Sequence, residues 1–239
     1  MFKKSALVIF SGGLDSTTCL YWAVNNYSVV HTLTFLYGQR NKVEVEYAKK
    51  TVDLIKKAGK DINMHFFKID LFQIGGSALT DRGIAVPKRR TLKDIGYGVP
   101  ATYVPFRNGI FLSLAAAFAE KENVDDVIGG WNTVDFSGYP DCREDFLKTM
   151  EKAINLGTKR GIEEKPIHVV FPLIYKSKME IVKFGKEMGA DYSYAYSCYE
   201  GKEIPCGECD SCILRKKGFM EAGFEDDFLV RLKKEGKLR

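Results

Sequence analysis

The sequence predicts an α/β protein built on a doubly wound parallel sheet, with a small cysteine-rich segment at its C-terminal end. Three observations support this prediction. Short apolar runs alternate with amphipathic stretches along most of the chain, as in β-α-β units. A glycine-rich turn follows the first apolar run, and four of the six cysteines lie within residues 198–212. We therefore expect one domain over residues 1–196 and a metal-binding segment over 197–239, packed on that domain.

Each predicted strand is a short apolar or β-branched run, and each predicted helix has the spacing of a surface helix. The predicted strands are 5–10, 28–37, 63–70, 125–130 and 167–173. The predicted helices are 17–26, 42–59, 108–123, 143–161 and 177–190. Gly59 is expected to end its helix, and Asn108 and Ser177 are expected to cap theirs. Residues 80–100 contain several glycines and prolines, which predict a long loop or lid.

The composition is that of a globular protein, with 45% hydrophobic and 28% charged residues among 239. The net charge of +5 suits anionic ligands but is too small to indicate nucleic acid by itself. No stretch reaches the roughly 18 apolar residues that cross a bilayer, and the opening MFKKSALVIF predicts a strand rather than a signal peptide. Because the cysteines form one cluster, we expect a reducing, cytoplasmic setting.

The turn SGGLDS, residues 11–16, is expected to bind a phosphate group. Glycines let backbone N–H groups approach an anion closely, and the following helix points its positive end at the same place. Ser11 and Ser16 add hydroxyl donors. Asp15 would repel phosphate, so we expect it to hold Mg²⁺. An ordinary strand–helix turn is the alternative. The string matches neither a Walker P-loop nor a dinucleotide-binding fingerprint.

The clustered cysteines have a spacing that favours a closed, structural zinc site. They are Cys198, Cys206, Cys209 and Cys212, in the pattern C-x7-C-x2-C-x2-C. An iron–sulfur cluster and disulfides remain alternatives at this point.

The other cysteines and the histidines carry weaker signals. Cys19 falls inside a predicted helix and is expected in the core. Cys142 lies in a polar segment, where a nucleophilic role stays open although no histidine partner is near it in sequence. His31, His65 and His168 each fall on or beside a predicted strand and are interpreted as structural.

Further polar residues follow predicted strands or precede a helix, where ligands bind in open α/β sheets. Tyr37 and Gln39 could contact a nucleotide, with a plain turn as the alternative. Arg107 stands just before a predicted helix, a suitable position for an anion. Lys176 and Lys178 follow a strand, and either could neutralise a leaving pyrophosphate. A surface role is the alternative for each of these cations.

The loop over residues 129–145 has the composition of a pocket for a flat, polar heterocycle. Aromatic side chains can stack on such a ring, and carboxylates can accept from its N–H groups. Its polar members are Asn132, Asp135, Ser137, Tyr139, Asp141 and Arg143. The basic stretch 87–90 is interpreted as a solvated loop, with closure over a nucleotide as the alternative.

Taken together, these motifs resemble one known family. SGGxDS is the signature of the PP-loop, or N-type ATP pyrophosphatase, superfamily, whose fold is adenine nucleotide alpha hydrolase-like. With YGQR, DLFQIGGSALT, TYVPFRN, VDFSGYPDCRE and the tail SCYEG…PCGECDSCILRKKGF, the chain resembles the 7-cyano-7-deazaguanine (preQ0) synthase family from residue 5 to about 224. Trp131 departs from the pattern, since a smaller residue is expected there.

The resemblance implies an ATP-dependent carbon–nitrogen ligase. In that family the carboxylate of 7-carboxy-7-deazaguanine attacks the α-phosphate of ATP, and ammonia displaces AMP to give an amide. A second ATP activates the amide, and loss of AMP leaves the nitrile preQ0, a precursor of queuosine in tRNA. The resemblance also implies ATP, Mg²⁺ and Zn²⁺ as ligands and a homodimer. It implies no direct nucleic-acid or membrane partner.

The resemblance further implies four groups of site residues. The residues expected to bind ATP are Phe10, Ser11, Gly12, Gly13, Leu14, Asp15, Ser16, Thr17, Thr18, Cys19, Leu20, Tyr37 and Gln39. Those expected to be catalytic are Asp15, Ser16, Arg107 and Lys178. Those expected to bind the deazapurine are Asp135, Ser137, Gly138, Tyr139, Asp141 and Arg143. The expected zinc ligands are Cys198, Cys206, Cys209 and Cys212.

Two other functions are kept as hypotheses. The first is another PP-loop enzyme that acts on tRNA, such as a thiolase or a lysidine-type ligase. Such enzymes usually carry an RNA-binding appendage or catalytic cysteines, and a net charge of +5 argues against this class. The second is a non-enzymatic zinc-knuckle binding module, which the long α/β body with its phosphate-binding turn disfavours.

Overall fold

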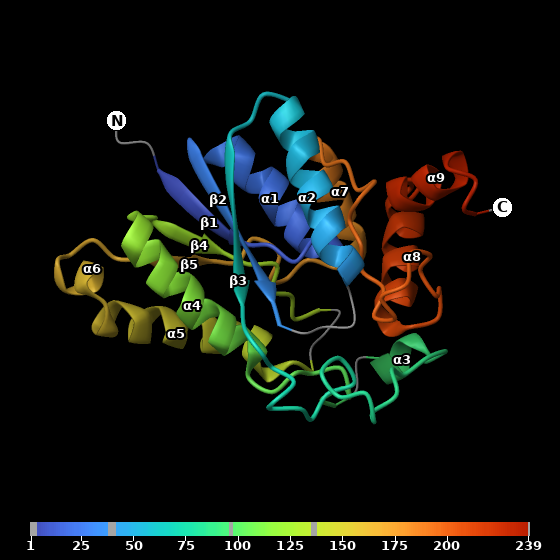
Figure 1. Ribbon diagram of the computed structural model, residues 1–239, viewed down its shortest axis with the longest axis horizontal. Coiled ribbons are helices and arrows are strands. Elements are labelled where there is room, and N and C mark those ends of the chain that lie inside the picture. Colours follow the sequence, from blue (N-terminus) through green and yellow to red (C-terminus); the bar gives the residue numbers. More distant parts are fainter. Residues whose placement is uncertain (1–3, 38–41, 96–97, 135–137, 239) are drawn as a thin grey trace.

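The computed structural model describes residues 4–37, 42–95, 98–134 and 138–238. These residues form one parallel sheet in the strand order β3-β2-β1-β4-β5 (Figure 1). The strands are β1 (Ser5–Ile9), β2 (Val29–Leu36), β3 (Ile62–Lys68), β4 (Asp126–Ile128) and β5 (His168–Val170). The chain moves outward from β1 to β3 and then crosses back to β4. The switch point of this doubly wound sheet therefore lies between β1 and β4, where open α/β sheets bind their ligands.

Helices cover both faces of the sheet (Figure 1). They are α1 (Leu14–Asn26), α2 (Lys42–Lys57), α3 (Leu92–Ile95), α4 (Arg107–Glu122), α5 (Glu144–Gly157), α6 (Lys159–Ile162), α7 (Lys178–Glu187), α8 (Asp210–Ala222) and α9 (Asp227–Lys234), with a 3-10 turn η1 (Pro140–Cys142). Among the described residues, none of these helices is long and apolar enough to cross a membrane.

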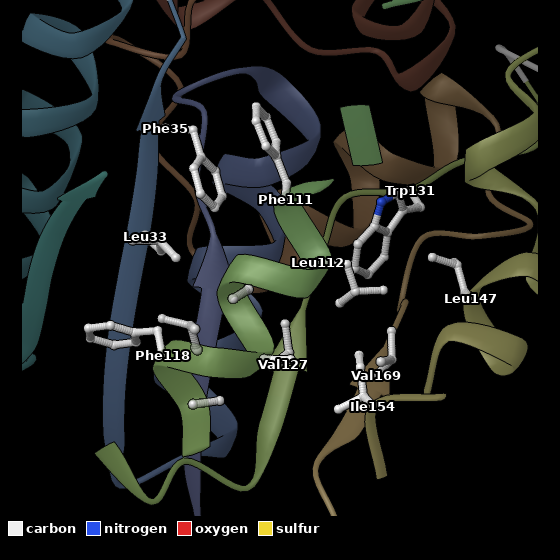
Figure 2. Packing of buried hydrophobic residues seen from close by; sticks show 14 of the residues in the cluster. Leu33, Phe35, Phe111, Leu112, Phe118, Val127, Trp131, Leu147, Ile154 and Val169 are labelled. Carbon is white, nitrogen blue, oxygen red and sulfur yellow. The ribbon is translucent and has the colours of Figure 1, made fainter. Parts of the chain in front are cut away.

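The alternation of side chains along β1 divides the core into two layers. Leu7 belongs to a cluster with Leu112 of α4 and Leu147 of α5, which Figure 2 shows between the strands and these helices. Ala6 and Val8, on the opposite face, pack in a second cluster with residues of α1, α2 and α7. Both faces of the sheet are thus buried, which explains why the predicted strands read as continuous apolar runs.

Two predicted helix ends are confirmed, and two details are wrong. Gly59 follows α2 with a positive φ of 84°, and Ser177 begins α7 with a full capping box. Asn108 does not cap α4, because the helix already begins at Arg107. The helix predicted over 143–161 is broken at Thr158, whose hydroxyl accepts from the N–H of Gly161 and starts α6.

The basic stretch interpreted as a solvated loop is outside the helices, and its residues Lys88 and Arg89 are exposed; it also pairs with the cysteine-rich segment. Lys88 contacts Glu200 at 3.0 Å. Its two neighbours, Arg89 and Arg90, pair with Glu208 at 2.8 Å and Asp210 at 3.0 Å. The backbone N–H of Arg89 also donates to the carbonyl of Glu208. Opposite charges on the two segments explain this contact, which sequence spacing could not reveal.

Candidate active site

A cavity of about 260 Å³ opens where the central strands end. Ile9 of β1, Phe35 of β2 and Gly129 after β4 all line it. The cavity therefore lies at the switch point, and the turn between β1 and α1 forms one of its walls.

This turn is shaped by close backbone packing and by hydroxyl contacts. Gly12 has a φ of +80°, and a Cβ there would lie 3.1 Å from the Cβ of Ala48 on α2. A larger residue would therefore be both strained and crowded. Ser11 and Ser16 hold their hydroxyls 3.1 Å apart, and the N–H of Gly13 donates to the Ser11 hydroxyl at 3.3 Å. The backbone is thus held tightly around the positive end of α1, which suits an anion.

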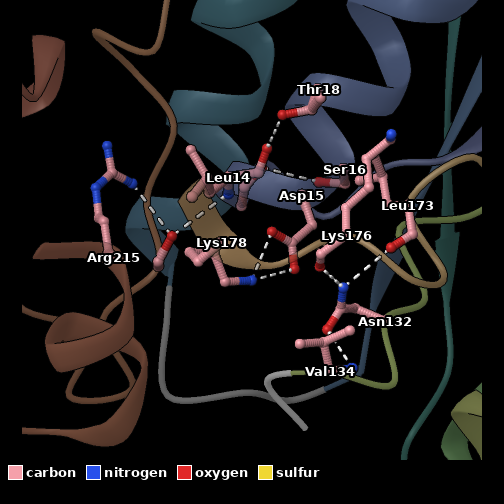
Figure 3. A network of polar contacts seen from close by, with 12 residues as sticks. Leu14, Asp15, Ser16, Thr18, Asn132, Val134, Leu173, Lys176, Lys178 and Arg215 are labelled. Atoms are coloured by element: carbon pink, nitrogen blue, oxygen red, sulfur yellow. Dashed lines mark hydrogen bonds and ion pairs between the residues drawn. The ribbon is translucent and has the colours of Figure 1, made fainter. Parts of the chain in front are cut away.

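Asp15 and Lys178 form an ion pair inside this cavity (Figure 3). The ammonium group of Lys178 lies 2.8 and 2.9 Å from the two carboxylate oxygens of Asp15. The side chain of Lys178 is only 7% exposed. Lys178 is the first residue of α7, and the cap at Ser177 fixes its backbone. Lys178, which was predicted from its position after a strand, thus reaches the turn at which we expect phosphate to bind.

The residues expected to bind ATP separate into two groups. Those lining the cavity are Phe10, Ser11, Gly13, Leu14, Asp15, Ser16 and Tyr37. Gly12, Thr17, Thr18, Cys19 and Leu20 do not line it. The carbonyl of Gly12 accepts from Tyr196, and the hydroxyl of Thr18 lies 2.7 Å from that of Tyr192. Burial raises the pKa of the Cys19 thiol well above its usual value. Gln39 lies outside the described residues.

Arg107 also lines the cavity, beside aromatic rings. Its guanidinium carbon lies 6.0 Å from the ring centre of Phe111, and it hydrogen-bonds to Tyr37. Burial raises the pKa of Tyr37, although the nearby guanidinium acts to lower it. Among the described residues, no carboxylate forms an ion pair with Arg107. Arg107 is thus a cation at the cavity wall, and the charge of the Asp141 carboxylate also acts on it.

The loop expected to bind a heterocycle places only part of its residues at the cavity. Tyr139 lines it, with its hydroxyl 2.9 Å from that of Thr102, and Trp131 lines it as a buried side chain. Asp141 is 2% exposed and does not line the cavity. Its carboxylate accepts from the backbone N–H of Asn108 at 2.9 Å and from the Asn108 amide at 3.1 Å. Asp141 thus supplies the N-terminal cap of α4 that sequence had assigned to Asn108.

The rest of that loop lies elsewhere or is not described. Arg143 is exposed at the start of α5, and Gly138 packs so closely on Gly98 that a Cβ would lie 1.9 Å from its carbonyl oxygen. Neither lines the cavity. Asp135 and Ser137 lie outside the described residues.

Cys142 lines the cavity, but its chemistry opposes a nucleophilic role. Burial, with the charge of Asp141, raises the pKa of its thiol to about 12. The thiol therefore stays protonated at neutral pH, whereas the nucleophilic form is the thiolate. None of the histidines lines the cavity; His31 and His65 contact each other at 3.2 Å across β2 and β3.

The four clustered cysteines come together in space. Their sulfur atoms all lie within 4.8 Å of one another. A zinc–sulfur distance of about 2.3 Å in a tetrahedral site places sulfurs about 3.8 Å apart, so the set fits such an ion. Backbone N–H groups donate to the sulfurs of Cys198 and Cys206, and Gly207 supplies the tight turn with a φ of +71°. The cysteines are not joined by disulfides.

Sequence reasoning missed the part of the cavity wall that comes from the cysteine-rich segment. Ser197, Tyr199, Ser211, Leu214 and Arg215 all line the cavity. The guanidinium of Arg215 is held by the carboxylate of Asp226 at 2.6 and 2.7 Å. One signal was present: Arg215 follows Cys212 by three positions, which places both on one face of a helix.

Comparison with known proteins gives consistent results. The profile of the family described as queuosine biosynthesis protein QueC matches residues 5–223. A 7-cyano-7-deazaguanine synthase of Picrophilus torridus is 49% identical over 222 residues, which cover 93% of this chain and 90% of that protein. One of Acetivibrio thermocellus is 48% identical over 223 residues, covering 93% and 96%.

Among solved structures, a 4-thiouridine synthetase in complex with RNA and ATP resembles this chain in fold. The TM-score is 0.51 at 20% sequence identity, and the match covers 98% of this chain and 53% of that one. At this identity the likeness concerns the fold alone, and it agrees with the predicted α/β class.

Proposed function

The chain belongs to the family of the queuosine biosynthesis protein QueC, and from this we propose that it makes 7-cyano-7-deazaguanine. The reaction is an ATP-dependent ligation of ammonia to 7-carboxy-7-deazaguanine, through an adenylate and an amide, in queuosine biosynthesis. The relatives that share about half of its residues carry the name of this activity. They do not favour the alternative of a PP-loop enzyme acting on tRNA.

One observation supports this reaction: a single cavity is lined by the SGGLDS turn, by the three cations Arg107, Lys178 and Arg215, and by aromatic rings. In this proposal the turn and Lys178 would bind the phosphates of ATP. Arg107 would bind a carboxylate, and the rings of Trp131 and Tyr139, which line the cavity, would contact a flat ring. Adenylation requires a carboxylate and an α-phosphate to meet, and a shared cavity brings both substrates together.

At the phosphate side, the backbone N–H groups of the turn and the hydroxyls of Ser11 and Ser16 would bind the anion. Lys178 would neutralise charge that builds up on the departing pyrophosphate. Mg²⁺ bound with ATP would offset further phosphate charge, and Asp15 is the carboxylate at the turn that would hold it. Since Lys178 already contacts both oxygens of Asp15, ion and ammonium would share this carboxylate.

At the acceptor side, Arg107 would orient the carboxylate of the deazapurine towards the α-phosphate. Cys142 lies in the same wall with a protonated thiol, so the chemistry proceeds without a cysteine nucleophile. The four-cysteine centre would hold Zn²⁺ as a closed, structural ion. We also propose that residues 197–239 act as a segment appended to the domain of 1–196, in a cytoplasmic homodimer.

The proposal is tested by one reaction. Purified protein is mixed with Mg²⁺, ATP, ammonium and 7-carboxy-7-deazaguanine, and the products are read by mass spectrometry. We expect the nitrile together with AMP and pyrophosphate. AMP without nitrile would overturn the acceptor and direct the search to tRNA, whereas no AMP from a folded sample would overturn the ATP site.

A matched pair of lysine variants sharpens this test. Lys178→Met removes the cation at Asp15 and is expected to lower kcat/KM by about a hundredfold or more. Lys176→Met, two residues earlier, removes a lysine that does not line the cavity and is expected to retain near-normal turnover. Equal losses in both variants would contradict the assignment of Lys178.

A further inference from the structure

Helix α8 joins the four-cysteine centre to the ATP-binding cavity. Cys209 precedes its first residue, and Cys212 lies in its first turn. Arg215 and Gly218 follow at intervals of three, so each of these residues is a neighbour of the next on the helix surface. The helix contacts the candidate active site at two separate points.

The first contact is made by Arg215, a buried guanidinium at the cavity wall. Asp226 holds it by two hydrogen bonds, of 2.6 and 2.7 Å, so its charge is already balanced. Its remaining nitrogen donates to the carbonyl of Ala195 at 2.6 Å and to the hydroxyl of Ser197 at 3.2 Å. Asp226 thus holds Arg215 in place, and Arg215 in turn holds the loop that contains Ala195 and Ser197.

That loop in turn holds the phosphate-binding turn. The N–H of Tyr196 donates to the carbonyl of Gly12 at 2.8 Å. The hydroxyl of Ser197 accepts from the N–H of Leu14, the first residue of α1, at 3.4 Å. The next residue is Cys198, a member of the four-cysteine centre. The loop is therefore tied at one end to that centre and at its middle to the turn.

The second contact is made by Gly218, which lies against Lys178. A Cβ at Gly218 would lie 2.7 Å from the Cγ of Lys178 and 3.0 Å from its backbone carbonyl carbon. Because one of these atoms is backbone, α7 would have to shift to accept even a methyl group. The absence of a side chain at Gly218 therefore allows α8 to pack directly against Lys178, the residue whose ammonium meets Asp15.

We propose that α8 is a positioning element, through which the four-cysteine centre sets the geometry of the phosphate-binding turn and of Lys178. Arg215, Ser197 and Gly218 are its positioning residues. The proposal rests on the proposed function only in that ATP binds at the turn. Displacements near 1 Å can cost about a hundredfold in rate, so a small movement of α8 is enough to matter.

The test compares two glycine-to-alanine variants. Gly218→Ala is expected to weaken binding of a non-hydrolysable ATP analogue about tenfold, measured by calorimetry with Mg²⁺ present. Gly157→Ala is the control, since Gly157 also lies in a helix but a Cβ there meets nothing within 4 Å. Its affinity for the analogue should not change. Metal content per chain and thermal unfolding are measured for both, so that loss of folding or of metal is recognised.

A second pair of variants keeps the proposal testable if Gly218→Ala does not fold. Arg215→Lys keeps the charge but loses the planar fork, and Arg215→Met loses both. We expect weaker analogue binding in both, graded with Met worse than Lys, while metal content stays at the wild-type level. Wild-type protein freed of metal by a chelator, and still folded by circular dichroism, is expected to show the same loss.

Unchanged analogue affinity in these variants, or in folded metal-free protein, would overturn the proposal. Because the readout is binding of an ATP analogue, it does not depend on nitrile formation. A protein that makes no nitrile but shows the expected affinity changes would contradict the proposed function alone. A protein that makes nitrile with unchanged affinities would contradict the role of α8 alone.

Discussion

Replacing Asp141 with alanine tests whether this carboxylate binds substrate or holds the start of α4. Its residue type and loop suggested a contact with the ring N–H groups of a substrate. The structure instead buries it to 2% exposure and directs both oxygens at Asn108. Asn108 follows Arg107 in the first turn of α4, so Asp141 holds the helix end that carries the cavity's cation.

The size of the effect follows from these contacts. Loss of a side-chain cap costs about 1 kcal/mol, and loss of a negative charge at a helix N-terminus adds about 0.5 kcal/mol. The Asn108 amide would keep only its contact with the sulfur of Cys142, at 3.3 Å, and leaving this half-buried donor poorly paired costs about 1–2 kcal/mol. We expect Asp141→Ala to lower the free energy of unfolding by about 3 kcal/mol. For a chain of this size the melting temperature should fall by about 10 °C.

Urea unfolding and calorimetry of three variants provide the assay. Asp141→Asn keeps one carbonyl oxygen as an acceptor for the backbone N–H, so it should lose only about 1 kcal/mol. Arg143→Ala changes an exposed neighbour in the same loop and should stay within about 0.5 kcal/mol of the wild type. An Asp141→Ala protein with wild-type stability but almost no activity would refute the reasoning and return Asp141 to the substrate site.

Four further predictions follow. Cys142 should resist alkylation by iodoacetamide at pH 8 in folded protein, because burial raises the pKa of its thiol to about 12, and should react in urea; labelling of folded protein would contradict this. Desolvation lowers the pKa values of His31 and His65, so the unfolded chain binds protons more readily than the folded chain does. The free energy of unfolding measured with urea should therefore fall as the pH drops below about 6.5, and this fall should be smaller in His65→Gln than in the wild type. Cys206→Ser should reduce bound metal measured by plasma mass spectrometry and lower the melting temperature; full metal content would contradict a four-sulfur site. Arg107→Gln should raise KM for the deazapurine acid by about tenfold or more while KM for ATP changes little, since it removes a charged hydrogen bond to the carboxylate; an equal rise in both would place Arg107 at the phosphates.

The parts of the fold that depend on local pattern could be predicted from the sequence. The buried strands have continuous apolar sequences because both faces of the sheet are covered. The SGGLDS turn is predicted as an anion site because its glycines lie next to the start of a helix. The capping box at Ser177 is equally local, since its partner Glu180 lies three residues away. The C-terminal helices α8 and α9 were not predicted, because that segment was interpreted from its cysteine spacing alone, as a metal-binding segment.

The parts that depend on distant contacts could not be predicted. Asp15 and Lys178 are 163 residues apart in sequence. Each was predicted as a site residue by itself, and only the folded structure shows that they form a pair. Asp141 shows the opposite case, in which a residue type suited to a ligand is used by the protein itself. A buried N–H at the start of a helix needs an acceptor as much as a substrate does. Residue type alone cannot decide between the two.

The balance of charge in the cavity gives each cation a different role. Arg215 is matched by Asp226, and Lys178 is matched by Asp15, so these pairs add little net positive charge. ATP brings several negative charges, which the pairs alone cannot offset, and this is a physical reason to expect a divalent cation with the nucleotide. Among the cavity's described residues, Arg107 forms no ion pair with a carboxylate. In the proposed role of Arg107, the acid substrate brings a carboxylate to this cation, and conversion to the neutral nitrile removes it. The proposed contact would therefore favour binding of the acid over binding of the product.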